Sequence, residues 1–238
     1  MAKLTFTPLY AQIKSSILHR IAAREWGPGS FLPSEMALAA EYGVSQGTLR
    51  KALNELTQEK RLVRFQGKGT AVAVLDADST MFPFFMLYDM KGNRVYPLSR
   101  TNAIQHDAAS REEASALNIA QGSEVIRIHR IRVLDEEPVI NEFIVLPVAR
   151  FPNFTCDLNK LPNTLYEQYY QHFGVFVIKA TEVLQAVLAD AQDQKFLHLK
   201  YELPLLEVQR KAFDIDGAVV EFRRSRINTR HHQYRICQ

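Results

Sequence analysis

Hydrogen-bonding and cationic side chains gather between residues 45 and 68, and their types suit contact with nucleic acid. Arg forms paired hydrogen bonds with guanine, Gln forms them with adenine, and Lys, Ser and Thr contact phosphate oxygens. A glycine at a loop tip lets backbone approach a groove where a side chain would collide. The residues that we expect to contact DNA are Ser45, Gln46, Thr48, Arg50, Lys51, Arg64, Gly67 and Lys68.

Positive charge is concentrated in the same part of the chain. Residues 1–74 hold ten Lys and Arg against five Glu, a sum of +5. The remaining 164 residues hold 19 against 21 Asp and Glu, or −2, which gives the total of +3. A basic segment on a mildly acidic body indicates a polyanionic partner, although five excess charges also arise from ordinary scatter. Whether this segment binds a polyanion must therefore be judged from the arrangement of its charges.

A first helix is expected to begin near Thr7 and Pro8, because Thr suits a capping position and Pro the first helical position. Its apolar residues repeat every four positions and form one stripe, at Leu9, Ile13, Ile17 and Ile21. The run Gly27-Pro28-Gly29 ends it.

Two shorter helices follow, with a tight turn between them. Ser34 suits the N-cap of one, which ends at Gly43, and Ser45 suits the N-cap of the next. The buried stripe of this last helix is Leu49, Ala52, Leu53 and Leu56. This spacing predicts a helix-turn-helix, whose second helix enters the major groove of DNA.

Two short strands, at residues 62–65 and 70–74, come next. The Gln66-Gly67-Lys68-Gly69 tip between them has the glycines that a tight hairpin requires. This hairpin would place Arg64 and Lys68 beside the last helix. Residues 1–74 are therefore interpreted as a winged helix-turn-helix domain.

The motifs of this domain, in this order, closely resemble the GntR family of bacterial regulators. They are Pro8-Leu9-Tyr10-Ala11-Gln12-Ile13, Pro28-Gly29, Leu32-Pro33-Ser34-Glu35, Leu38-Ala39, Gly43-Val44-Ser45, Thr48-Leu49-Arg50-Lys51-Ala52-Leu53 and Gly67-Lys68-Gly69-Thr70. The resemblance covers roughly 65 residues and implies sequence-specific DNA binding.

Two positions depart from the family pattern. Family members often carry Arg where this chain has Met36 and Gln46, whereas Arg50 and Gly67 match the pattern. Because Gln pairs with adenine rather than guanine, Gln46 is expected to change the preferred operator. Phosphate contacts are expected instead from Ser45, Thr48, Lys51, Arg64 and Lys68.

A second domain is expected at residues 83–238, after a linker at 75–82 that lacks any apolar period. Strands are predicted at 125–133, 139–146, 205–213, 218–226 and 233–236, and Asp216-Gly217 is expected to be the turn of a hairpin. One helix is predicted after Ser110, which begins a capping box. Two more are predicted after Asn163 and after Asp190, the last of them extending to Leu199. Hairpins with few helices predict an α+β fold with an antiparallel sheet.

This layout resembles the effector-binding domain of the HutC subfamily of GntR regulators, called the UTRA domain, which has a chorismate-lyase-like fold. The similar segments are Ile128-His129-Arg130-Ile131-Arg132, Glu137-Pro138-Val139, Leu146-Pro147, Thr164-Leu165-Tyr166, Pro204-Leu205-Leu206-Glu207-Val208-Gln209-Arg210 and Asp214-Ile215-Asp216-Gly217 with Glu221. The resemblance implies an effector site at Arg130, Arg132, Thr164, Tyr166 and Glu221.

The chemistry of this site leaves two alternatives open. Arg130 and Arg132 lie two residues apart, so on a regular strand both face one side and suit a carboxylate or phosphate. They could instead pair with Asp135, Glu136 or Glu142. The run Arg223-Arg224-Ser225-Arg226 could likewise line a pocket or form the wet face of an edge strand. After Glu221 the chain also departs from the sugar-phosphate binders of the family, which leaves the effector's identity open.

Several other classes are excluded by the sequence. The longest apolar runs span seven residues, too few for a membrane span, and we expect no signal segment, because the first residues lack an apolar core with a cleavage site. Two cysteines, Cys156 and Cys237, are too few for a disulfide scaffold. No phosphate loop, nucleophile elbow or zinc signature is present, so we expect no catalysis, metal or cofactor.

The sequence therefore predicts a cytoplasmic homodimeric regulator, commonly a repressor in this family. Its partners would be double-stranded DNA with a palindromic operator and a small anionic effector, a carboxylate or phosphate. The alternative is an enzyme or sensor, such as a lyase, whose basic segment binds nucleic acid without sequence preference.

Overall fold

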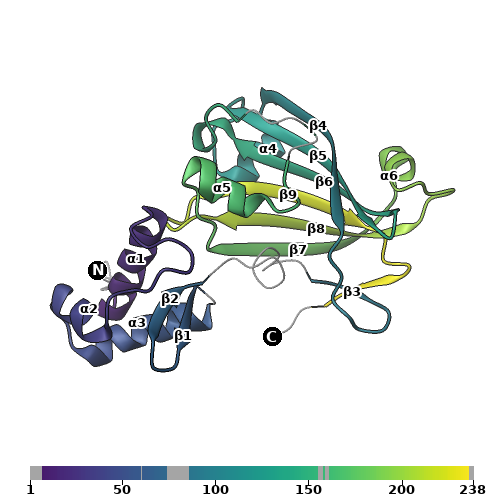
Figure 1. The fold of residues 1–238 in the computed structure, drawn as a ribbon. Helices are drawn as coiled ribbons and strands as arrows, with labels where there is room; N and C mark the ends of the chain where they lie inside the picture. The colour runs from purple at the N-terminus through teal and green to yellow at the C-terminus, as the bar shows by residue number, and fades with distance from the viewer. Residues whose placement is uncertain (1–6, 60, 74–85, 155–157, 159–160, 236–238) are drawn as a thin grey trace, which may run out of the picture. The chain divides into compact units, whose positions relative to one another are not determined.

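The computed structural model describes residues 7–59, 61–73, 86–154, 158 and 161–235. The chain divides between residues 81 and 82 into two compact units, each with its own elements (Figure 1). The expected linker at 75–82 and both cysteines lie outside the described residues. The proposed domain limits of 1–74, 75–82 and 83–238 thus stay a prediction. No described helix is long and apolar enough to cross a membrane.

The N-terminal unit contains three helices, α1 (Leu9–Ala22), α2 (Glu35–Glu41) and α3 (Gln46–Gln58). Ser34 and Ser45 cap α2 and α3 as expected, each accepting a hydrogen bond from the backbone N–H three residues on. Pro8, not Thr7, is the N-cap of α1, and no side chain caps that helix. The core is formed by Ile13, Ile17, Ile21, Leu38, Leu49, Ala52, Leu53, Leu56 and Leu62, whereas Leu9 of the predicted stripe is exposed.

The wing consists of β1 (Leu62–Phe65) and β2 (Gly69–Val72), which pair antiparallel. Gly67 at the tip has φ +73° and Gly69 has φ +115°, so the hairpin uses backbone conformations that favour glycine. A third extended segment joins the wing, because Leu32 N donates to Thr70 O at 2.8 Å and Val72 N donates to Ser30 O at 2.9 Å. The wing is thereby fixed to the chain that leads into α2.

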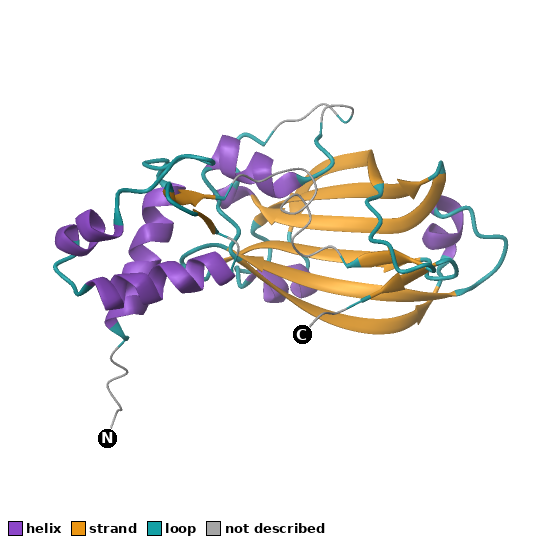
Figure 2. Ribbon diagram, turned by 60° about the horizontal axis from the view of Figure 1, so that its bottom comes forward, coloured by secondary structure: helices purple, strands orange, loops and turns teal. Residues whose placement is uncertain are grey.

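The C-terminal unit is built on one antiparallel sheet of six strands in the order β4-β5-β6-β9-β8-β7 (Figures 1 and 2). A separate ribbon pairs β3 with β10. The bounds are β3 Leu87–Asp89, β4 Leu98–Ala108, β5 Glu124–Leu134, β6 Glu137–Pro147, β7 Lys179–Leu188, β8 Pro204–Phe213, β9 Val219–Ile227 and β10 His232–Tyr234. The antiparallel α+β class predicted from the sequence is confirmed.

Helices cover both faces of this sheet. Leu165 and Tyr169 of α5 (Leu165–Phe173) pack with Ile126, Ile128 and Ile144 on one face. Neighbouring strand residues point to the opposite face, where α4 (Arg111–Leu117) packs against Val125 and where α6 (Ala191–Phe196) also lies. A short 3₁₀ turn, η1 (Val148–Arg150), follows β6. Even-numbered residues of β5 and β6 thus share the α5 face.

Local signals located the helices of this unit but not all of its strands. Ser110 forms the capping box that its spacing predicts, and Asp190 caps α6 as expected, through a capping box that was not predicted, although α6 ends before Leu199. Asn163 does not cap α5, because its Oδ1 instead accepts a hydrogen bond from Ser99 N at 2.7 Å. Sequence patterns missed β4 and β7, the two outer strands of the sheet, because their residues are largely exposed and lack an apolar alternation.

Candidate DNA-binding and effector-binding sites

The N-terminal end of α3 presents the first group of predicted DNA contacts. Ser45 Oγ accepts a hydrogen bond from Thr48 N at 3.2 Å, and the two hydroxyl oxygens lie 2.9 Å apart. The buried stripe of α3 faces the other helices, so Gln46, Arg50 and Lys51 are exposed. Lys51 Nζ lies 3.8 Å from the centre of the Tyr10 ring, a cation–π contact that keeps the ammonium group near α1.

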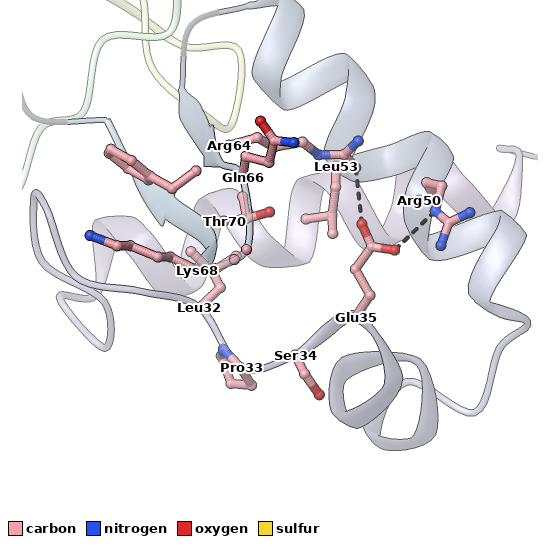
Figure 3. A pocket seen from close by; sticks show the side chains of 13 residues that line it. Leu32, Pro33, Ser34, Glu35, Arg50, Leu53, Arg64, Gln66, Lys68 and Thr70 are labelled. Atoms are coloured by element: carbon pink, nitrogen blue, oxygen red, sulfur yellow. Dashed lines mark hydrogen bonds and ion pairs between the residues drawn. The ribbon is translucent and has the colours of Figure 1, made fainter.

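A groove of about 770 Å³ lies between α3, the start of α2 and the wing (Figure 3). Its lining includes Glu35, Arg50, Arg64, Gly67 and Lys68, whereas Ser45, Gln46, Thr48 and Lys51 lie outside it. Arg50 Nε donates to Glu35 Oε2 at 2.9 Å, and Arg64 Nη2 donates to Glu35 Oε1 at 3.0 Å. The Glu35 carboxylate therefore connects α3, the second helix of the helix-turn-helix, to β1 of the wing. The sequence patterns did not predict this contact.

In the C-terminal unit, the two predicted arginines of β5 are buried on the α5 face. Arg130 donates from Nε and Nη2 to Glu142 Oε1, at 3.0 and 2.8 Å. Arg132 is less closely paired, with its Nη1 3.7 Å from the same oxygen. Both also donate to Asn163 O, at 3.4 and 3.5 Å, beside Thr164. Of the three acids considered as partners, Glu142 is the one that pairs.

Two further predicted effector residues, Tyr166 and Glu221, are in contact with each other, and Glu221 is fully buried. Tyr166 donates its hydroxyl to Glu221 Oε1 at 3.1 Å, and Tyr169 donates to Oε2 at 2.7 Å. Arg223 donates from Nε and Nη2 to the same carboxylate and from Nη1 to Glu142 Oε2 at 3.1 Å. Arg223 thus joins the Glu221 group to the Arg130 group in one network.

A third carboxylate extends the network to the outer strand. Arg210 Nε donates to Glu182 Oε1 at 2.7 Å, and the hydroxyl of Tyr234 donates to Glu182 Oε2. We call the charged residues of this face the arginine cluster: Arg130, Arg132, Arg210, Arg223, Glu142, Glu182 and Glu221. Four guanidiniums against three carboxylates leave the cluster with a net charge of +1.

Electrostatics single out Arg132 within the cluster. Burial, together with the neighbouring guanidiniums and against the opposing effect of Glu142, lowers the pKa of Arg132 to about 9. Burial would raise the pKa of Glu142, but Arg223, Arg130 and Arg132 hold that pKa well below its ordinary value. Burial and the charge of Glu221 raise the pKa of Tyr166 to about 12, so its hydroxyl stays protonated and can donate.

The structure excludes one of the two alternatives for residues 223–226, the wet face of an edge strand. β9 lies between β6 and β8, so it is not an edge strand. Arg223 and Ser225 are buried on the α5 face, where both contact Glu142. Arg226 projects to the opposite face and pairs with Asp190, Asp193 and Glu207. Residues two apart on a strand share a face, so Arg223 would have been predicted on the face of Glu221 if β9 had been recognised as a central strand.

Comparison with known proteins agrees with both halves of this description. Residues 9–72 match the model of the bacterial regulatory proteins of the gntR family, and residues 96–233 match the UTRA domain. The mannosyl-D-glycerate transport/metabolism system repressor of Escherichia coli K12 is 26% identical over 96% of this chain and 95% of its own. The histidine utilization repressor of Pseudomonas aeruginosa is 29% identical over 94% and 89%.

A solved structure supports the second half. It is the ligand-binding domain of a protein assigned to the GntR family, from Bordetella bronchiseptica, with 28% identity and a TM-score of 0.60. The match covers 65% of this chain and 97% of that one.

Fold and comparisons together define a transcriptional regulator with separate DNA-binding and effector-binding domains. The chain belongs to the GntR family and carries the UTRA domain of its HutC branch. The resemblance noted in the sequence is therefore confirmed, and the family is one of regulators rather than enzymes.

Gly67→Ala tests the approach of the wing tip to DNA. A Cβ at Gly67 would meet no protein atom within 4 Å, so only the positive φ opposes the substitution. We expect a loss of about 1 kcal/mol in unfolding free energy and a much larger loss of operator affinity, measured by fluorescence anisotropy. Gly217→Ala, with φ +78° and equally open space, is the matched control in the other domain. Equal operator affinities for the two variants would contradict the contact.

Gln46→Arg tests base selection at the start of α3. We expect the operator selected from a random DNA library to change at one base pair per half-site, from a preference for adenine to guanine. The expected discrimination is about 1–3 kcal/mol at that position. Identical motifs for wild type and variant would show that Gln46 does not contact a base.

Proposed function

We propose that this protein is a cytoplasmic repressor that binds a palindromic operator as a homodimer and releases it when a small anion occupies the arginine cluster. The repressors among its relatives support the direction of the response. A two-fold operator would present half-sites about one helical turn apart. The observation that carries the effector assignment is the net positive charge buried on the α5 face of the sheet.

On the DNA side, the proposal assigns roles by exposure and chemistry. Gln46 and Arg50 are exposed at the start of α3 and contact base edges. Gly67 brings the wing backbone close to the minor groove. The remaining predicted contacts bind phosphates and set the position of the domain on the duplex: Ser45, Thr48, Lys51, Arg64 and Lys68.

On the effector side, charge balance favours a carboxylate over a phosphate. Buried charges are tolerated when they are paired, and a single negative charge would neutralise the cluster. A phosphate monoester carries about −1.5 to −2 at neutral pH and would overcompensate it. Arg132 is the guanidinium held least closely by Glu142 and is the binding point for the carboxylate.

The other predicted effector residues have supporting roles in this proposal. Arg130 is already paired with Glu142, and Thr164 lies next to the carbonyl that both arginines contact. Tyr166 can donate a hydrogen bond to ligand oxygens in place of Glu221. Glu221 already accepts hydrogen bonds from two tyrosines and Arg223, so it positions those donors.

Arg132→Met tests this assignment by thermal unfolding of the full chain against a panel of small carboxylates and phosphate esters. We expect a carboxylate to stabilise the wild type, by about 2.7 kcal/mol at a concentration of 100 times Kd. Arg132→Met should remove this stabilisation. Without ligand, its stability should stay within about 1–2 kcal/mol of wild type, because the variant loses hydrogen bonds to backbone carbonyls but also removes a buried charge that other guanidiniums repel.

Arg127→Met is the matched control. Arg127 lies on the same strand but faces α4, where it pairs with Asp107 and Glu113. This variant should keep the full carboxylate response. The proposal would be wrong if Arg132→Met responded as strongly as Arg127→Met, or if phosphate esters alone stabilised the wild type.

A further inference from the structure

Glu35 occupies an unusual position for a carboxylate in a DNA-binding groove. It lies at the first residue of α2, and its two oxygens accept hydrogen bonds from Arg50 of α3 and Arg64 of β1 (Figure 3). The charged residues that line the groove are otherwise cationic: Arg50, Arg64 and Lys68. A negative charge here opposes the approach of DNA phosphates.

Stability alone does not account for this carboxylate. The side chain of Arg50 is 58% exposed and that of Arg64 is 40% exposed, with Glu35 itself at 28%. Ion pairs this accessible to water contribute little to folding. The arrangement instead has a geometric effect, because one side chain fixes two guanidiniums that belong to different elements.

The hydrogen bond to Glu35 uses Nε of Arg50 and leaves its two terminal nitrogens, Nη1 and Nη2, for a contact with DNA. Glu35 engages Nε of Arg50, so the guanidinium plane is held while its two terminal nitrogens extend past the carboxylate. A fixed guanidinium plane favours the paired contact with guanine O6 and N7 over a single contact with a phosphate. Specific recognition commonly combines such an attraction with a repulsive element against wrong partners.

We propose that Glu35 is a specificity-determining positioning residue that holds Arg50 and Arg64 for operator recognition and disfavours nonspecific binding. This inference rests on the proposed DNA contacts of these two arginines. Glu35 contacts no base itself, and it acts by fixing the angle between the wing and α3. Removing it should therefore weaken discrimination more than affinity.

The test compares the full-length wild type, Glu35→Gln and Glu35→Asp on the operator that the wild type selects and on a scrambled duplex of equal length. Glu35→Gln should lower the ratio of specific to nonspecific affinity roughly tenfold, within the discrimination of one paired base contact. It should also steepen the salt dependence of nonspecific binding by about 0.9 in log–log slope, because one opposing charge is lost. Glu35→Asp keeps the charge but is too short to reach both arginines, so it should lose discrimination without that change in slope.

Glu25→Gln is the control, because Glu25 pairs with Arg20 in the same domain and does not line the groove. It removes the same charge and should leave the ratio unchanged. A wild-type ratio in Glu35→Gln or Glu35→Asp, or an equal fall in Glu25→Gln, would overturn the role of Glu35 while operator selection by the wild type still supports the DNA contacts. A wild type that selects no operator would overturn both proposals.

Discussion

The ion pairs of Glu142 are the interaction on which the C-terminal unit depends. This buried carboxylate accepts hydrogen bonds from Arg130 and Arg223, and it is the nearest acid to Arg132. Without it, Arg130 and Arg132 would lose their carboxylate partner on this face of the sheet, at a cost of several kcal/mol per buried ion. Because the arginine cluster holds four guanidiniums against three carboxylates, we propose that the arrangement that stabilises the sheet also favours an anion.

In the N-terminal unit, too, one carboxylate pairs with more than one arginine, but these ion pairs are exposed to solvent. Glu35 also connects two arginines, but its ion pairs are open to water and contribute little to stability. Buried carboxylates therefore hold the sheet of the effector domain together, whereas we propose that the exposed one orients side chains for recognition. In that proposal, the arrangement of the charges on the DNA surface matters more than their number.

Features decided by neighbouring residues could be predicted from the sequence. Ser34, Ser45 and Ser110 cap helices, and the Asp216-Gly217 hairpin and Gly67 wing tip form, because caps and turns depend on a few adjacent residues. Side-chain pairings that depend on strand register could not be predicted from the sequence. Glu142 lies opposite Arg130 on one side and Ser225 on the other, and the role of Arg223 requires a central strand. Spacing along the chain specifies neither the register of Glu142 nor the central position of the strand that carries Arg223. It also did not predict the exposed strands β4 and β7.

In the proposed regulation, sequence-specific binding to DNA is released by an anion bound elsewhere in the chain. Quantitative footprinting of the full chain on its operator, with and without a saturating carboxylate that stabilises the protein, measures this coupling. We expect a discrete, two-fold symmetric protected site that is lost when the carboxylate is added, since binding at two coupled sites is reciprocal. Uniform protection, or a discrete site that persists unchanged at saturation, would contradict it.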